Sequence, residues 1–86
     1  MQRIIKVLNK LVADDDIEEL KVVSDYKTME TTVSFCFYYV EFLADEPFFL
    51  LVLPSAKSIS IDGLGDDEGR GMMTLLFDGV LDREAN

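Results

Sequence analysis

The segment from Asp62 to Gly71 is where groups capable of chemistry lie closest together in this 86-residue sequence. Among its glycines it holds four carboxylates, at Asp62, Asp66, Asp67 and Glu68. Carboxylate oxygens suit calcium, but an EF-hand loop spaces its ligands at every second residue and ends in a bidentate glutamate, and this segment does neither. A dinucleotide fingerprint fails as well, because Glu68 takes the place of its third glycine. We therefore expect a solvated acidic loop that holds no metal ion and no cofactor.

Nucleophilic and hydrolytic chemistry lacks the residues it would need. The sequence contains no histidine that could activate Cys36, and a cysteine among aromatic neighbours is typically an inert, buried thiol. Ser55 and Ser58 flank Lys57 without the Ser-x-x-Lys spacing, and no Gly-x-Ser-x-Gly motif is present. Two carboxylates could serve a glycosidase, but a chain this short cannot build both a substrate cleft and a core. The sequence predicts a protein that is not an enzyme.

The charge balance argues against direct binding of nucleic acid. There are 17 acidic and 8 basic residues, for a net charge of -9, whereas binding to a phosphate backbone requires clustered lysine and arginine. The aromatic residues between Phe35 and Phe49 lie among Glu41, Asp45 and Glu46. An RNA-binding sheet instead surrounds its stacking aromatics with basic residues. We interpret these aromatic residues as core.

The remaining composition indicates one small cytoplasmic domain spanning residues 1–86. The lone Cys36 cannot form an intramolecular disulfide, which favours a reducing compartment. Lys6, Asn9 and Lys10 interrupt any signal-peptide core near the N-terminus. The longest apolar runs are only six residues long, whereas a membrane helix needs about 18 or more. No membrane span is expected.

Hydrophobic periodicity predicts a helix over residues 2–13, with basic side chains on its polar face. The three aspartates that follow should end it, because they oppose the negative end of the helix dipole. Acidic residues at capping-box spacing allow a short helical turn at residues 16–21, which Asp15 and Asp16 would cap. The alternation from Leu20 to Tyr26 favours a strand there instead.

Residues 31–43 and 48–53 are apolar on both faces, so we expect two central strands joined as an antiparallel hairpin by a turn at residues 45–47. Ile59 and Ile61 alternate with polar residues, which indicates a half-buried edge strand. Residues 72–81 favour a helix over a strand, although Gly79 counts against the helix. The predicted fold is α+β: an N-terminal helix, an antiparallel meander of three or four strands, and a C-terminal helix or edge strand.

The acidic residues are unevenly spread along the chain. Residues 1–27 have a net charge of -1, and residues 28–86 have one of -8. Three clusters should lie at the surface: Asp14, Asp15, Asp16, Glu18 and Glu19; Asp45 and Glu46; and Asp62 with Asp66, Asp67 and Glu68. Such clusters either keep a small protein soluble or bind a basic protein surface.

In size, acidity and lack of catalytic groups, the chain resembles the class that includes phage anti-CRISPR and anti-restriction proteins, nucleic-acid mimics and toxin-immunity proteins. This resemblance is one of composition and carries over no functional residue. It implies an inhibitor that covers the basic, nucleic-acid-binding surface of a larger partner such as a nuclease. The alternative is a homodimeric structural or assembly subunit, in which a second copy covers sheet faces that the helices leave bare.

Overall fold

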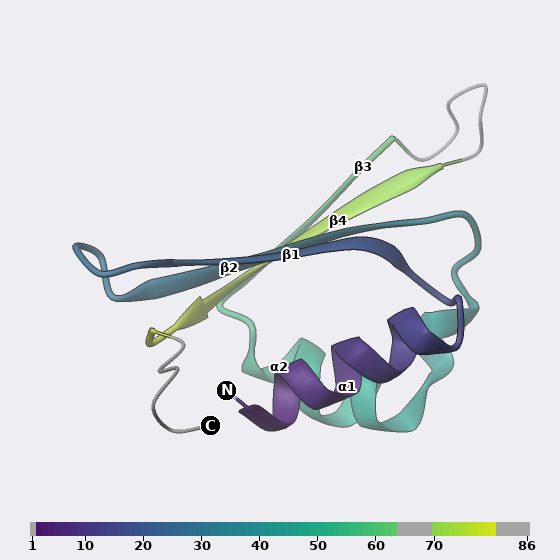
Figure 1. Ribbon diagram of the computed structural model, residues 1–86, viewed down its shortest axis with the longest axis horizontal. Helices are drawn as coiled ribbons and strands as arrows, with labels where there is room; N and C mark the ends of the chain where they lie inside the picture. The colour runs from purple at the N-terminus through teal and green to yellow at the C-terminus, as the bar shows by residue number, and fades with distance from the viewer. Residues whose placement is uncertain (1, 64–69, 81–86) are drawn as a thin grey trace.

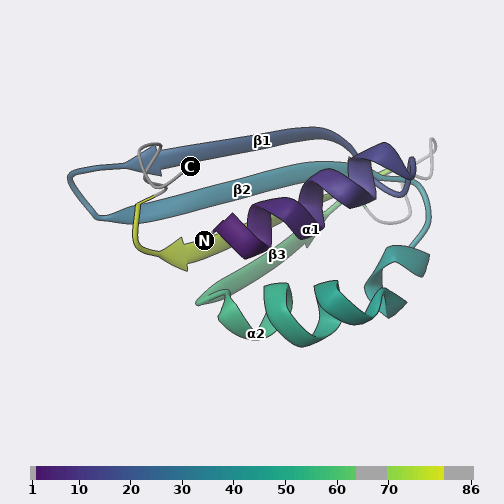
Figure 2. The ribbon, with the colours of Figure 1, turned by 60° about the horizontal axis from the view of Figure 1, so that its bottom comes forward.

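Eight short elements make up the part of the chain that the computed structural model describes, residues 2–63 and 70–80 (Figure 1). In chain order they are α1 (Gln2–Ala13), β1 (Glu18–Asp25), β2 (Glu30–Phe37), η1 (Glu41–Ala44), η2 (Phe48–Val52), α2 (Leu53–Ser55), β3 (Ser58–Asp62) and β4 (Gly71–Asp78). The helices lie on one side of a four-stranded antiparallel sheet (Figure 2). This confirms the predicted α+β class, with its N-terminal helix and antiparallel strands.

The strands follow the order β1-β2-β4-β3 across the sheet, and all three neighbouring pairs are antiparallel. A strict meander would place β3 beside β2, but here β4 takes that position. The chain between β2 and β3 is helical, so β3 is not joined to β2 by a tight turn. β3 therefore lies at one edge of the sheet and β1 at the other.

Alternating residues of the two central strands form the sheet side of the core. The buried residues of β2 and β4 that face the helices are Thr31, Val33, Phe35, Phe37, Gly71, Met73, Leu75 and Phe77. From the helical side, α1 contributes Ile4, Leu8 and Leu11, which recur at helical spacing. Four phenylalanine rings, from Phe35, Phe37, Phe42 and Phe48, pack with centroid distances between 5.0 and 6.4 Å.

The predicted strand over residues 48–53 is wrong, because residues 46–55 form one helix that includes η2 and α2. We call it the second helix. Asp45 caps its start: Asp45 Oδ1 accepts a hydrogen bond from the backbone N–H of Phe48 at 3.0 Å. Pro47 fits the first turn, where a helix has no partner for a backbone N–H. Residues 45–47 therefore begin a helix and do not turn a hairpin.

Two further predicted elements differ from the structure. The strand expected over residues 31–43 ends at Phe37, and η1 follows it and buries Phe42. The helix favoured over residues 72–81 is wrong, because β4 occupies residues 71–78 with side chains that alternate between the two sides of the sheet. Gly79, at a φ of 97°, takes a left-handed conformation directly after this strand. β4 is a central strand and not an edge strand.

The edge position of β3 agrees with the prediction, but its predicted half-burial does not. All five of its residues are exposed. In Figure 1, β3 begins next to the helical layer and runs away from it. Its side chains therefore receive little cover from the helices.

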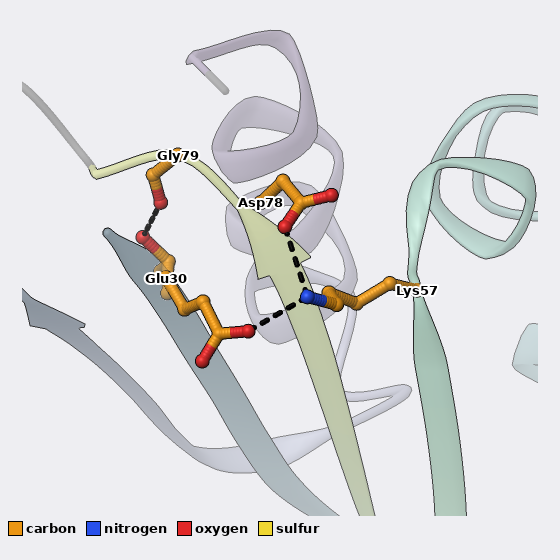
Figure 3. A network of polar contacts seen from close by, with 5 residues as sticks. Glu30, Lys57, Asp78 and Gly79 are labelled. Carbon is orange, nitrogen blue, oxygen red and sulfur yellow. Dashed lines mark hydrogen bonds and ion pairs between the residues drawn. The ribbon is translucent and has the colours of Figure 1, made fainter. Parts of the chain in front are cut away.

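Lys57 links the start of β3 to the two central strands. Its Nζ lies 2.7 Å from Glu30 Oε2 on β2 and 3.0 Å from Asp78 Oδ1 on β4 (Figure 3). Its backbone N–H donates to the carbonyl of Leu76 at 2.7 Å. The two carboxylates, Glu30 most strongly, raise the pKa of Lys57 above its ordinary value of 10.5. One side chain thus connects three strands at this end of the sheet.

We expect the stabilising effect of Lys57 to disappear at high pH. A lysine whose pKa is raised by folding contributes fully below its ordinary value of 10.5 and loses that contribution as the pH rises through the folded value. Lys57→Met should lower the melting temperature only modestly near neutral pH, because the ion pairs are exposed. Thermal melts of both proteins from neutral to strongly alkaline pH should show this difference shrinking to zero. A difference that persists would mean that the charge is not its source.

Candidate functional site: an acidic and aromatic cleft

A cleft of about 430 Å³ opens where α1 leads into β1 and where β2 leads into η1. Buried apolar residues line part of it, namely Ile17, Phe37 and Phe42. Its remaining lining includes four carboxylates and two tyrosines: Asp15, Asp16, Glu18, Glu41, Tyr38 and Tyr39. Among the residues that the structure describes, no lysine or arginine lines it. We call this hollow the acidic cleft.

The end of α1 places two of these aspartates. The backbone N–H of Asp16 donates to the carbonyl of Leu11 at 2.9 Å, and that of Asp15 donates to the carbonyl of Val12 at 3.1 Å. This pairing is the Schellman motif. Asp15 accordingly adopts a left-handed conformation, with a φ of 61°. The helical turn considered for residues 16–21 does not form, because β1 begins at Glu18, so Asp15 and Asp16 cap no following helix.

Asp15→Gly should raise the free energy of unfolding by about 1 kcal/mol. Glycine adopts the left-handed conformation without steric cost, and the substitution also removes a negative charge from the negative end of the helix dipole. Urea denaturation checks the expected gain. Asp15→Ala separates the two causes, since it removes the charge but keeps a Cβ atom. An alanine variant as stable as the glycine variant would contradict the conformational argument.

The opposite wall of the cleft comes from the chain as it leaves β2. Tyr38 and Tyr39 follow the last residue of that strand, and they are 51% and 75% exposed. Glu41 begins η1 next to them. Phe42 holds this wall in place, because it is buried and its ring centroid lies 5.0 Å from that of Phe37. Two exposed tyrosines are therefore attached to an anchored segment of backbone.

A guanidinium group of the chain itself lies next to the cleft. Arg70 Nη2 lies 3.5 Å from Glu18 Oε1 and forms a salt bridge with Glu19. The thiol of Cys36 donates to Glu19 Oε2 at 3.2 Å, and burial raises the pKa of that thiol. A raised pKa keeps Cys36 protonated and weakly nucleophilic. The carboxylates at this end of the sheet thus already bind one arginine side chain.

The described acidic residues of the three predicted surface clusters differ in their surroundings. Of the first cluster, Asp15, Asp16 and Glu18 line the acidic cleft. The other two members are held by basic side chains, Asp14 by Lys10 at 3.1 Å and Glu19 by Arg70.

The second cluster lies elsewhere, and of the third cluster the structure describes only Asp62. Asp45 caps the second helix, and Glu46 lines a groove between that helix and α1. Asp62 is exposed at the end of β3, whereas Asp66, Asp67 and Glu68 lie outside the described residues. The interpretation of Tyr38 and Tyr39 as core residues is wrong, because they are exposed and, together with Glu41, which the sequence did not single out, complete the site.

The groove between the two helices is larger, at about 720 Å³. It is lined by apolar residues that include Val7 and Leu50, and its charged residues are Arg3, Lys6 and Glu46. This mixture of charges does not complement a basic surface. The acidic cleft is therefore the better candidate site.

Comparisons of the chain with models of protein families, with curated proteins and with solved structures find no match. In residues 2–63 and 70–80, no helix has the length and apolar character needed to cross a membrane. The same residues contain no group of three or more side chains placed to hold a metal ion.

Proposed function

We propose that this protein is a small non-enzymatic inhibitor that binds the basic, nucleic-acid-binding surface of a larger partner, such as a nuclease, through its acidic cleft. The observation that carries the proposal is the gathering of four carboxylates and two exposed tyrosines around one hollow. Carboxylates attract lysine and arginine, and the face of a tyrosine ring attracts a cation within about 6 Å. A protein that covers a basic channel in this way would exclude nucleic acid from it.

Three of the four carboxylates of the cleft are free to bind a partner, whereas Glu18 and several others in the chain are paired with basic side chains. Glu30 and Asp78 pair with Lys57, and Asp14 pairs with Lys10. By contrast, Asp15, Asp16 and Glu41 form no salt bridge with any other described residue. Their position around a hollow that is also lined by tyrosines supports a role in binding.

Arginine suits this site better than lysine. Its planar guanidinium group pairs with a carboxylate through two hydrogen bonds and also stacks on an aromatic ring. Within the chain, Arg70 already pairs with two carboxylates of this region, those of Glu18 and Glu19. We therefore expect the partner to present arginine side chains at the contact.

The test compares two triple variants that lose the same number of charges. One neutralises the cleft, with Asp15→Asn, Asp16→Asn and Glu41→Gln. The other neutralises three acids that do not line the cleft, with Asp14→Asn, Glu46→Gln and Asp62→Asn. Binding of an arginine-rich peptide at low salt should weaken about tenfold or more in the cleft variant and only about twofold in the control. Equal losses would mean that net charge alone is responsible, and no binding by the wild type would reject the proposal.

Two further measurements connect binding to inhibition and to the tyrosines. The protein should displace DNA from a nuclease with an arginine-lined channel, and the cleft variant should do so poorly. A lysine-rich peptide of equal length should bind the wild type more weakly than the arginine-rich peptide. Tyr38→Leu with Tyr39→Leu should remove most of that preference, because the aliphatic side chains offer no ring on which a guanidinium group can stack.

A further inference from the structure

β3 leaves one edge of the sheet open. Its neighbour on one side is β4, with which Ser58 to Asp62 pair in an unbroken register. On its other side no strand follows within the described residues, and all five of its side chains are exposed. An open strand edge offers unpaired backbone N–H and C=O groups to a further strand.

The two edges of the sheet differ in how they are protected. β1, at the opposite edge, carries charged residues at Glu18, Glu19, Lys21 and Asp25. Its register is also interrupted between Glu18 and Lys21, and Glu19 has a positive φ of 55°. Charges and irregular backbone are the usual devices that prevent strands from pairing edge to edge. β3 has neither a register shift nor a charge before Asp62.

β3 also exposes apolar side chains on the side of the sheet that faces the helices. Ile59 lies opposite Leu75, and Ile61 lies opposite Met73, so all four side chains point to the same side. Leu75 and Met73 are buried, whereas Ile59 is 47% exposed and Ile61 is 39% exposed. The apolar side of the sheet that packs against the helices therefore continues from β4 onto β3, where it is exposed.

We propose that a second copy of the chain pairs with β3, antiparallel and with a two-fold axis at Ser60. In this register Ile59 lies opposite Ile61 of the second copy, and Ser58 lies opposite its Asp62. The register pairs all five residues, brings the four isoleucines together and places no like charges opposite each other. The result is a continuous eight-stranded sheet with both helical layers on one side.

A second copy fits this edge better than an unrelated strand does, because the short sequence Ser58 to Asp62 is complementary to itself about its central residue. The expectation of a dimer from two central strands that are apolar on both faces no longer applies, since residues 48–53 are helical. Pairing through β3 leaves the acidic cleft open, because Glu18 of the cleft belongs to the opposite edge strand. This inference therefore does not depend on the proposed function.

Disulfide trapping tests the axis and the register directly. Under mild oxidation Ser60→Cys should form a covalent dimer, because opposite Cα atoms in an antiparallel pair are about 4.5–5.5 Å apart, within the range a disulfide spans. Ser58→Cys is the matched control, since its two copies would be separated by roughly 13 Å along the strands. The wild type is the negative control, because its own cysteine, Cys36, is buried.

Sedimentation measures the dimer without a cross-link. The wild type should dimerise at a concentration of about 100 μM, as expected for a small interface. Ile59→Lys should weaken this association about tenfold or more, because it places a charge at the interface between the two β3 strands. Val23→Lys is the control, because it makes the same change in charge at the other edge of the sheet. Val23 lies on β1 and is 55% exposed.

The proposal stands if Ser60→Cys cross-links, Ser58→Cys does not, and only Ile59→Lys weakens the dimer. A wild type that remains monomeric overturns it, and so does equal cross-linking of the two cysteine variants. Equal weakening by Ile59→Lys and Val23→Lys would also overturn it, because the association would then follow charge and not the β3 edge. Circular dichroism of each variant confirms that it is folded before it is scored.

Discussion

Replacing Phe48 with alanine should lower the free energy of unfolding by about 3–5 kcal/mol, a large part of the stability of a domain this small. Phe48 is fully buried. Its ring centroid lies 5.3 Å from that of Phe42 and 6.3 Å from that of Phe35, in edge-to-face arrangements. The substitution would remove these contacts and leave a cavity between the second helix and the sheet.

Two neighbouring residues act as controls for this experiment. Phe49 is 57% exposed and Leu50 is 62% exposed, so Phe49→Ala and Leu50→Ala should each cost less than about 1 kcal/mol. Leu50 also tests the helix itself, because in a strand it would share a face with Phe48 and Val52. Urea denaturation gives all three values. A loss for Leu50→Ala as large as that for Phe48→Ala would contradict the helical assignment of this segment.

Gly71→Ala should lower the free energy of unfolding by about 1–3 kcal/mol. At a strand position with room for a methyl group, replacing glycine with alanine usually stabilises the protein by roughly 0.5–1 kcal/mol, because alanine has less backbone freedom to lose on folding. Gly71 lies opposite Phe37 in the sheet, and an added Cβ atom would stand 2.6 Å from Cζ of that ring. The ring cannot move aside easily, since it is buried against Phe42, with centroids 5.0 Å apart.

A double-mutant cycle isolates the contact between Gly71 and Phe37. Phe37→Leu alone should destabilise the protein by leaving a cavity, but it also frees the space that the new methyl group needs. The combined variant should therefore lose less stability than the two single variants together. Urea denaturation measures these losses. If they are additive, the ring of Phe37 does not cause the loss of stability in Gly71→Ala.

The local hydrophobic pattern was sufficient to predict the helices and strands that present one face to the core. The 3.6-residue periodicity of residues 2–13 predicted α1, and the alternation from Leu20 to Tyr26 predicted β1. Residues 48–53 have no such pattern, because a run that is apolar all round fits a strand and a buried helix equally well. The deciding signal was the aspartate at position 45 followed by Pro47, which together mark the start of a helix.

The candidate site could be predicted only in part, because it depends on pairing between distant residues. The cluster of acids at residues 14–19 was evident, but its meeting with Tyr38, Tyr39 and Glu41 was not. The β1–β2 register brings them together by setting Glu18 opposite Cys36. Pairing the two predicted strands about the polar connection at residues 27–30 would have placed these segments side by side.

The position of β4 between β2 and β3 also determines how the protein can fold while it is being synthesised. β1 and β2 can pair as soon as both have left the ribosome, but β3 has no neighbour in the sheet until residues 71–78 follow. Until then β2 has one unpaired edge, and Val33 and Phe35 lack the strand beside them. A ribosome that pauses shortly before Gly71 would therefore hold a chain with exposed core residues and open strand edges, the state in which chaperone binding or aggregation is most favoured.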